Sequence, residues 1–353
     1  MSQMDFFNRS NRYASSQQDR PSHTHSGPPE QPNHDKSQKS RFPEKGLVFV
    51  YGALRSGTTA LGLMLNAHEN IIHLGEVDFL FDHLRKDSSG PGGWRYRRSE
   101  LAEDRIFRAK DLKLPANVDG RDLFLHMISD LTSGGGGVTA LNVHRHAEHL
   151  LELLPEARII HLLRDPRDVA RSSIAMGWVG NTYYGVDHWV ASEHAWDSIA
   201  ERLKPDQVLT VRYENLIRNT EVELRRITEF LGMPYRACML FYHETSTYSP
   251  PDPKLVEQWR HKLKPRDIAL VESKAGPLMR ARNYTPVAPS SEPSAVERLK
   301  LWLGNKSYRF GFGIRRYGFA LFVGEMLSRR LGAQQLNNRL KRRIAERSVP
   351  FLK

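Results

Sequence analysis

A turn rich in glycine and hydroxyl residues contains the side chains best suited to binding an anion. The segment Gly52-Ala-Leu-Arg-Ser-Gly57-Thr58-Thr59 has the spacing of a phosphate-binding P-loop, but Thr58 stands where such loops have lysine. A loop of this kind points successive backbone N–H groups at a phosphate, near the positive end of a helix dipole. Without the lysine, the loop favours one phosphate carrying a small group over a nucleoside triphosphate, with Arg55 as the cation. A tight strand–helix turn with no ligand would use the same glycines.

A second candidate anion site lies further along the chain. Arg164 follows the apolar run at residues 158–163, and Ser172 comes two helical turns later. An arginine that leaves a strand and a serine within the next helix can face the same anion. Asp165 and Pro166 fit the N-cap and the first position of that helix.

The elements that must position these residues can be recognised from the hydrophobic pattern. Apolar runs rich in β-branched residues predict buried parallel strands at 47–51, 158–163 and 207–211. Helical patterns begin at 60–65 and 165–168, and an amphipathic stretch at 221–231 ends at Gly232. Alternation of strands and helices predicts an α/β fold with a parallel sheet between two layers of helices. The stretch 85–137 gives no clear pattern, and we expect its run Gly134–Gly137 to be a loop.

Four segments together resemble the sulfotransferases that use 3′-phosphoadenosine 5′-phosphosulfate (PAPS). The turn Arg55-Ser-Gly-Thr-Thr59 resembles their 5′-phosphosulfate loop, and residues 160–173 resemble their 3′-phosphate segment. Residues 211–216 resemble their tyrosine segment, which implies that Tyr213 lies near the adenine. Residues 252–284 resemble their closing segment. The resemblance covers residues 46–286 and implies a P-loop-containing three-layer sandwich.

The resemblance implies an enzyme that moves a sulfuryl group from PAPS to a hydroxyl, or to an amine. The Arg-Ser-Gly-Thr-Thr and Gly-Glu patterns favour a carbohydrate, lipid or peptide acceptor over small phenols. One alternative is a P-loop nucleotide kinase, which Thr58 disfavours, and another is a non-catalytic, membrane-associated module that keeps only the fold. The residues implied to bind the cofactor are Arg55, Ser56, Gly57, Thr58, Thr59, Arg164, Ser172 and Tyr213.

Two residues compete for the role of general base, and Arg55 is the third residue that we assign to catalysis. Glu76 follows Gly75, and in the tyrosylprotein and many bacterial sulfotransferases a Gly-Glu at this place carries the base. His144 matches the histidine of a Lys-x-His sequence in the cytosolic branch, but here the lysine place holds Asn142. This departure removes an expected cation, for which Arg145, His146 or Arg55 could substitute. We expect Glu76 to be the base.

The composition excludes several classes of protein. Cys238 is the only cysteine, so neither an intrachain disulfide framework nor a cysteine zinc site can form. No paired metal-ligand spacing occurs, and we expect no metal cofactor. The N-terminus lacks the apolar core of a signal peptide, so we expect a cytoplasmic protein. We expect no nucleic-acid partner, since residues 46–286 carry no net charge.

The charge and composition divide the chain into three parts. Residues 1–43, poor in aliphatic residues, predict a disordered leader, and residues 44–286 the sulfotransferase domain. Residues 287–353 carry a net charge of +10 and predict a helical, basic amphipathic extension. Within it, residues 295–353 suit the peripheral binding of an anionic membrane. A polyanionic acceptor, RNA, or simple docking of the extension on the core are the alternatives.

Overall fold

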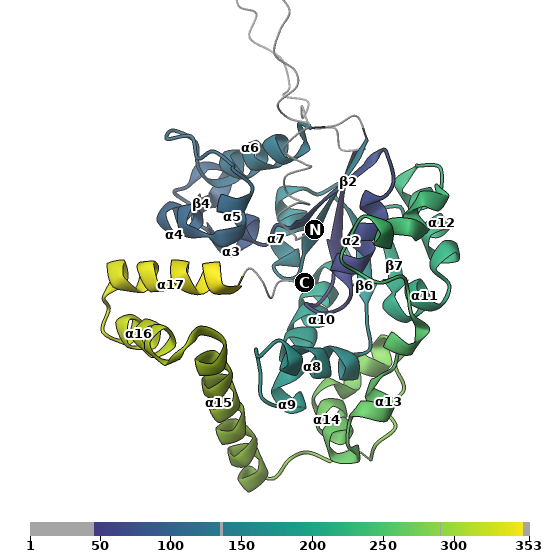
Figure 1. Cartoon of the computed structure of the whole chain (residues 1–353). Coiled ribbons are helices and arrows are strands. Elements are labelled where there is room, and N and C mark those ends of the chain that lie inside the picture. The colour runs from purple at the N-terminus through teal and green to yellow at the C-terminus, as the bar shows by residue number, and fades with distance from the viewer. Residues whose placement is uncertain (1–45, 135–136, 290, 349–353) are drawn as a thin grey trace, which may run out of the picture.

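A central sheet of five parallel strands organises the molecule. The computed structural model describes residues 46–134, 137–289 and 291–348 (Figure 1). The strand order is β2-β5-β1-β6-β7, and every pairing is parallel. This arrangement confirms the predicted α/β class. The strands are β1 (Leu47–Tyr51), β2 (Ile71–Glu76), β5 (Val138–Val143), β6 (Arg158–Leu163) and β7 (Val208–Arg212).

Alternate side chains of the strands build two separate cores, which makes the molecule three-layered. Val48 and Val50 of β1 face one core, while Phe49 and Tyr51 face the other. The first core is completed by α2 (Thr58–Asn66), α11 (Tyr213–Arg218) and α12 (Thr220–Leu231). The second is completed by α6 (Gly120–Thr132), α7 (Ala147–Leu153) and α10 (Asp187–Ala200) (Figure 1).

Most of the predicted elements are present with small shifts. The strands at 47–51 and 158–163 match β1 and β6, and the strand predicted at 207–211 is β7, one residue later. The Asp165 side chain caps α8 (Pro166–Ala175), accepting a hydrogen bond from the Arg167 N–H. Gly232 ends α12 with a φ of 70°. Gly135 and Gly136 of the predicted loop lie outside the described residues.

An insertion and several short elements surround this framework. Between β2 and α6 lie α3 (Phe79–Asp82), β3 (Leu84–Lys86), η2 (Pro91–Gly93), β4 (Trp94–Tyr96), α4 (Arg98–Glu103) and α5 (Arg105–Ala109). Strands β3 and β4 form an antiparallel pair. The later elements are α9 (Thr182–Gly185), η3 (Ala237–Glu244), η4 (Pro253–Leu255), α13 (Trp259–Lys262) and α14 (Pro265–Ala281).

The C-terminal extension is helical, as predicted, and it contacts the core through both α15 and α17. It consists of α15 (Ala295–Tyr317), α16 (Phe319–Arg330) and α17 (Gln334–Ser348) (Figure 1). On α15, the Asn305 Oδ1 accepts a hydrogen bond from the Gly180 N–H at 2.7 Å. On α17, Arg342 pairs with Glu103 at 2.7 Å. No helix in the described residues is long and apolar enough to cross a bilayer. The predicted leader, residues 1–43, lies outside them.

Candidate active site

The candidate residues meet at the carboxyl edge of the parallel sheet, where α/β proteins commonly bind ligands. The P-loop follows β1, Glu76 ends β2, and Tyr213 follows β7. Within the loop, Arg55 and Gly57 adopt positive φ angles of 73° and 98°. A Cβ on Gly57 would lie 2.3 Å from the ring of Tyr213, so only glycine fits beneath that ring. These three strands thus bring distant segments of the sequence to one place.

The predicted phosphate-binding residues form one connected cluster, here called the anion site (residues 55–59, Arg164 and Ser172). Arg55 Nε donates a hydrogen bond to Ser172 Oγ at 2.9 Å. Arg164 donates one to the backbone oxygen of Arg55 at 3.0 Å, and its guanidinium lies 4.1 Å from the centre of the Tyr213 ring. The structure therefore places Tyr213 against both the loop and Arg164.

Two buried donors in the anion site have no partner among the described residues. They are the Ser56 hydroxyl and Nε of Arg164. Leaving a buried donor unpaired costs about 1–3 kcal/mol. Burial lowers the pKa of the Arg55 guanidinium, and the nearby charge of Arg164 contributes to that lowering. A cluster of two close cations and unpaired donors is chemically suited to a phosphate or sulfate group.

His144 lies beneath the loop, held by a carboxylate that the sequence analysis did not identify. Its Nδ1 lies 2.7 Å from Asp78 Oδ2, and its backbone N–H donates to Asp78 Oδ1 at 2.8 Å. Its Nε2 lies 3.3 Å from Thr58 Oγ1. Burial disfavours the charged imidazole, but Asp78 outweighs this effect and raises the pKa of His144. Both ring nitrogens are engaged, so His144 supports Thr58 from inside the protein.

Glu76 is exposed at the end of β2, on the sheet edge where the anion site lies. It aligns with Asn142 in the pairing of β2 with β5. Its carboxylate lies close enough to Arg55 and His144 for its charge to act on the pKa of both groups, and it favours their charged forms. Among residues 46–134, 137–289 and 291–348, no hydrogen bond to this carboxylate is found. Its oxygens are therefore available to an incoming group.

The place of the expected lysine is used differently in this chain. Asn142 Oδ1 lies 2.9 Å from His73 Nε2, deep in the protein. Of the proposed substitutes, Arg145 makes a bidentate pair with Asp82 at 2.6 Å. His146 Nε2 also faces Asp82, at 3.5 Å. Both residues are thus engaged with a carboxylate of the insertion.

Lys110, a residue that sequence reasoning missed, brings another cation close to Glu76. Its ammonium group donates a hydrogen bond to the backbone oxygen of Leu74. Burial lowers the pKa of Lys110 to about 8, and the charge of Glu76 partly offsets this effect. The residue follows α5, in the part of the sequence that gave no clear pattern. A lone lysine there carries no signal, since only the folded insertion brings it to β2.

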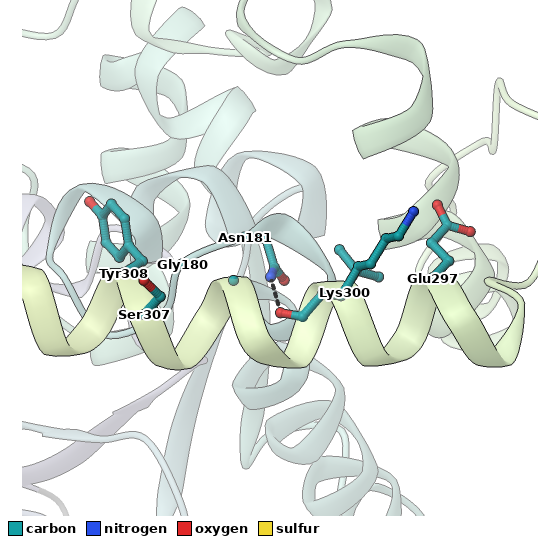
Figure 2. Close-up of a pocket in the computed structure, with 8 residues that line it drawn as sticks. Gly180, Asn181, Glu297, Lys300, Ser307 and Tyr308 are labelled. Atoms are coloured by element: carbon teal, nitrogen blue, oxygen red, sulfur yellow. Dashed lines mark hydrogen bonds between the residues drawn. The ribbon is translucent and has the colours of Figure 1, made fainter.

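Two features lie outside the anion site. His146, Glu148 and His149 have ligand atoms within 4.8 Å of one another, so the expected absence of a metal stays a prediction. A cavity of about 530 Å³ lies between α15 and residues 180–181, lined by Lys300, Ser307 and Tyr308 among others. Figure 2 shows Lys300 and Glu297 on the α15 side of this cavity. None of its lining residues belongs to the anion site.

Comparison with known proteins identifies relatives of this fold. The model of a family described as "Sulfotransferase family" matches residues 48–237. A putative protein-tyrosine sulfotransferase of Caenorhabditis briggsae is 27% identical over 213 residues, covering 56% of this chain and 69% of the relative. An uncharacterized protein of Aquifex aeolicus is 25% identical over 227 residues. That match covers 58% of this chain but only 28% of the relative's length.

The chain also resembles a solved structure in its fold. The sulfotransferase domain from the curacin biosynthetic pathway superposes with a TM-score of 0.51 at 18% identity. The superposition covers 71% of this chain and all of that domain. At this identity the likeness concerns the fold, namely the parallel sheet and its flanking helices.

Proposed function

The chain belongs to the sulfotransferase family, and from this we propose that it transfers a sulfuryl group from PAPS to a hydroxyl acceptor. The observation that carries the proposal is the anion site. There, Arg164 contacts the backbone of Arg55, and the Ser56 hydroxyl and Nε of Arg164 are buried donors without a partner among the described residues. A P-loop without lysine, but with a second arginine nearby, suits a nucleotide that carries separate 5′ and 3′ anionic groups.

Each residue of the anion site has a role in this proposal. Residues 55–59 would hold the 5′-phosphosulfate through backbone N–H groups, the hydroxyl groups and Arg55. Arg164 and Ser172 would hold the ribose 3′-phosphate, and Tyr213 would flank the adenine. When bound, PAPS supplies the activated sulfuryl group. The positive charge of Arg55 and the helix N-terminus favour the negative charge that develops on the leaving phosphate.

We propose Glu76 as the base that takes the proton from the acceptor hydroxyl. A base must reach the proton that it removes, and Glu76 is exposed at the end of β2, on the same sheet edge as the anion site. His144 is buried with both ring nitrogens engaged, by Asp78 and Thr58. Its role in the proposal is to position the Thr58 hydroxyl. Lys110, close to Glu76, would be the cation that compensates for Asn142.

The acceptor is proposed to be a hydroxyl on a peptide, a lipid or a carbohydrate, with an amine as the alternative. The relative named for protein tyrosine supports a peptide hydroxyl first. An exposed base suits an acceptor presented on a larger molecule, because the acceptor need not enter a closed cavity.

The experiment is transfer of labelled sulfate from PAPS to three acceptor classes: a tyrosine-containing peptide, a lipid extract and a carbohydrate mixture. The labelled product identifies the acceptor class. Stabilisation by adenosine 3′,5′-bisphosphate, measured by thermal unfolding, is scored separately. If ATP stabilises the protein as strongly as the bisphosphate does, the chain is better explained as a nucleotide kinase. If the bisphosphate binds but no acceptor is labelled, the non-catalytic binding module is favoured.

A further inference from the structure

Helix α15 has an apolar face on each of two opposite sides. The inner side packs on the core: the Tyr308 hydroxyl donates to the backbone oxygen of Ile174 at 3.1 Å. On the same side, the ring of Phe312 covers Gly177, where a Cβ would lie 2.1 Å from it. The outer side is formed by residues that are 41–63% exposed: Val296, Leu299, Leu303 and Phe310.

The outer residues form one continuous stripe. At 3.6 residues per turn, their positions fall within an arc of about 60°, and this arc lies opposite the packed side. Large apolar side chains also remain exposed beyond α15, namely Phe319, Leu327, Leu331 and Leu336. Phe310 contacts the ring of Phe322 on α16, with ring centres 5.7 Å apart, but all four outer residues stay 41–63% exposed. An ordinary surface helix buries its single apolar face, so a second apolar face that stays this exposed indicates a binding partner. The name "outer stripe" is used below for Val296, Leu299, Leu303 and Phe310.

Basic residues accompany these exposed apolar groups. Residues 287–353 contain 14 Lys and Arg against 4 Asp and Glu, whereas residues 46–286 are balanced. Exposed members are Arg309, Arg315, Arg329, Arg330, Arg339, Lys341 and Arg343. The partner must therefore accept positive charge and apolar side chains together.

We propose that the outer stripe and the basic residues of α15–α17 dock on an anionic lipid bilayer. A second copy of the chain would bring two positively charged surfaces together, which disfavours association. A nucleic acid would pair with the basic residues but leave the leucines and the phenylalanine in water. A bilayer with anionic headgroups accepts both, because the apolar stripe enters the acyl boundary while the arginines meet the headgroups.

The docked helix would be linked to the opening of the anion site. The inner side of α15 contacts Gly177 and Gly180, and between them Trp178 lies 6.0 Å from the Arg55 guanidinium. Binding through the outer stripe would therefore leave the inner contacts intact. It would hold the segment that flanks Arg55 close to the membrane surface. The proposal goes beyond sulfuryl transfer and can be tested without it.

The test is sedimentation of the full chain with vesicles of phosphatidylcholine alone, or of equal parts of phosphatidylcholine and phosphatidylglycerol. We expect binding to the anionic vesicles only, weakened by salt through screening. A triple variant, Leu299→Ser, Leu303→Ser and Phe310→Ser, should bind the anionic vesicles at least tenfold more weakly. The matched control changes three exposed apolar residues of the core, Val222→Ser, Leu255→Ser and Phe241→Ser, and should bind like wild type.

Further measurements keep the outcome clear. Thermal unfolding, with and without adenosine 3′,5′-bisphosphate, must give the same shift for both variants, which shows that the core and the anion site are intact. Replacing Arg339, Lys341 and Arg343 by glutamine should also reduce vesicle binding. Failure of the full chain to bind anionic vesicles at low salt overturns the proposal. The proposal is also overturned if the stripe variant still binds vesicles and RNA competes for that binding. It is likewise overturned if the wild type forms a dimer that the stripe variant does not form.

Discussion

Replacing Arg164 by alanine tests the anion site most directly. We expect Arg164→Ala to weaken the binding of adenosine 3′,5′-bisphosphate but to have little effect on adenosine 5′-monophosphate. The reason is that Arg164 is proposed to contact the 3′-phosphate, which the monophosphate lacks. The 5′ contacts of the P-loop are present with both ligands.

The magnitude follows from the donors that the structure leaves unused. Arg164 already donates one hydrogen bond, to the backbone oxygen of Arg55, while its buried Nε has no partner. One hydrogen bond from a charged group to a phosphate contributes about 1.5–3 kcal/mol. This corresponds to roughly a 10- to 150-fold increase in Kd.

Isothermal titration with both ligands and both proteins gives a complete thermodynamic cycle. Arg225→Ala is a matched control. The Arg225 guanidinium also lies 4.1 Å from the centre of a tyrosine ring, that of Tyr235, but Arg225 belongs to α12 and not to the anion site. It also pairs with a carboxylate, Glu221. Arg225→Ala should change neither affinity. Equal losses with the bisphosphate and the monophosphate in Arg164→Ala would refute the assignment, since they would mean that the loop itself had been disturbed.

Three further predictions concern the groups around the anion site. Glu76→Gln should reduce kcat about 10²- to 10⁴-fold in steady-state assays and leave bisphosphate affinity unchanged, whereas His144→Ala should do less; the reverse order would make His144 the base. Lys110→Met should raise the free energy of unfolding at pH 7, measured in urea, because burial lowers the pKa of Lys110 from its ordinary value to about 8. In the wild type, stability should rise with pH above about 8 as the native state loses this proton before the unfolded state does, and the variant should lack that rise. Asp78→Asn should destabilise the protein by about 3–5 kcal/mol. The loss should be largest below the ordinary histidine pKa and smaller at alkaline pH, because Asp78 raises the pKa of His144 in the folded state; a loss that does not change with pH would contradict this coupling.

The sequence predicted those parts of the site whose conformation depends only on neighbouring residues. Asp165 and Pro166 start α8 by capping chemistry alone, and the glycines of the P-loop are required by its positive φ angles. Strand β5 was not predicted, although its six residues are all buried between β1 and β2. It follows the glycine run directly. Its six residues include the polar Thr139 and Asn142, and so short a run has too little periodicity to distinguish a strand from a helix.

Asp78 and Lys110 were missed for a different reason. Their positions depend on how the insertion between β2 and α6 folds back on the sheet edge. Asp78 reaches His144 across 66 residues of sequence, and Lys110 reaches the backbone of β2 across 36. Neither of these sequence separations corresponds to a helical or strand period or to a known motif. Such contacts can be recognised only when the topology is known, because the sequence around each residue is compatible with an ordinary surface charge.

Asn142, which stands at the place of the expected lysine, is part of a packed group that includes residues of β2 and α2. The His73 ring that pairs with Asn142 also presses on α2, where a Cβ on Gly62 would lie 2.1 Å from it. Burial lowers the pKa of His73 to about 4, so the ring is neutral at physiological pH. A lysine at position 142 would lose the hydrogen bond to His73 and bury an ammonium group beside a neutral ring. Asn142, His73 and Gly62 therefore form one packing unit, and within it a cation is excluded. In our proposal, the positive charge near Glu76 then has to come from outside the sheet, which is where Lys110 lies.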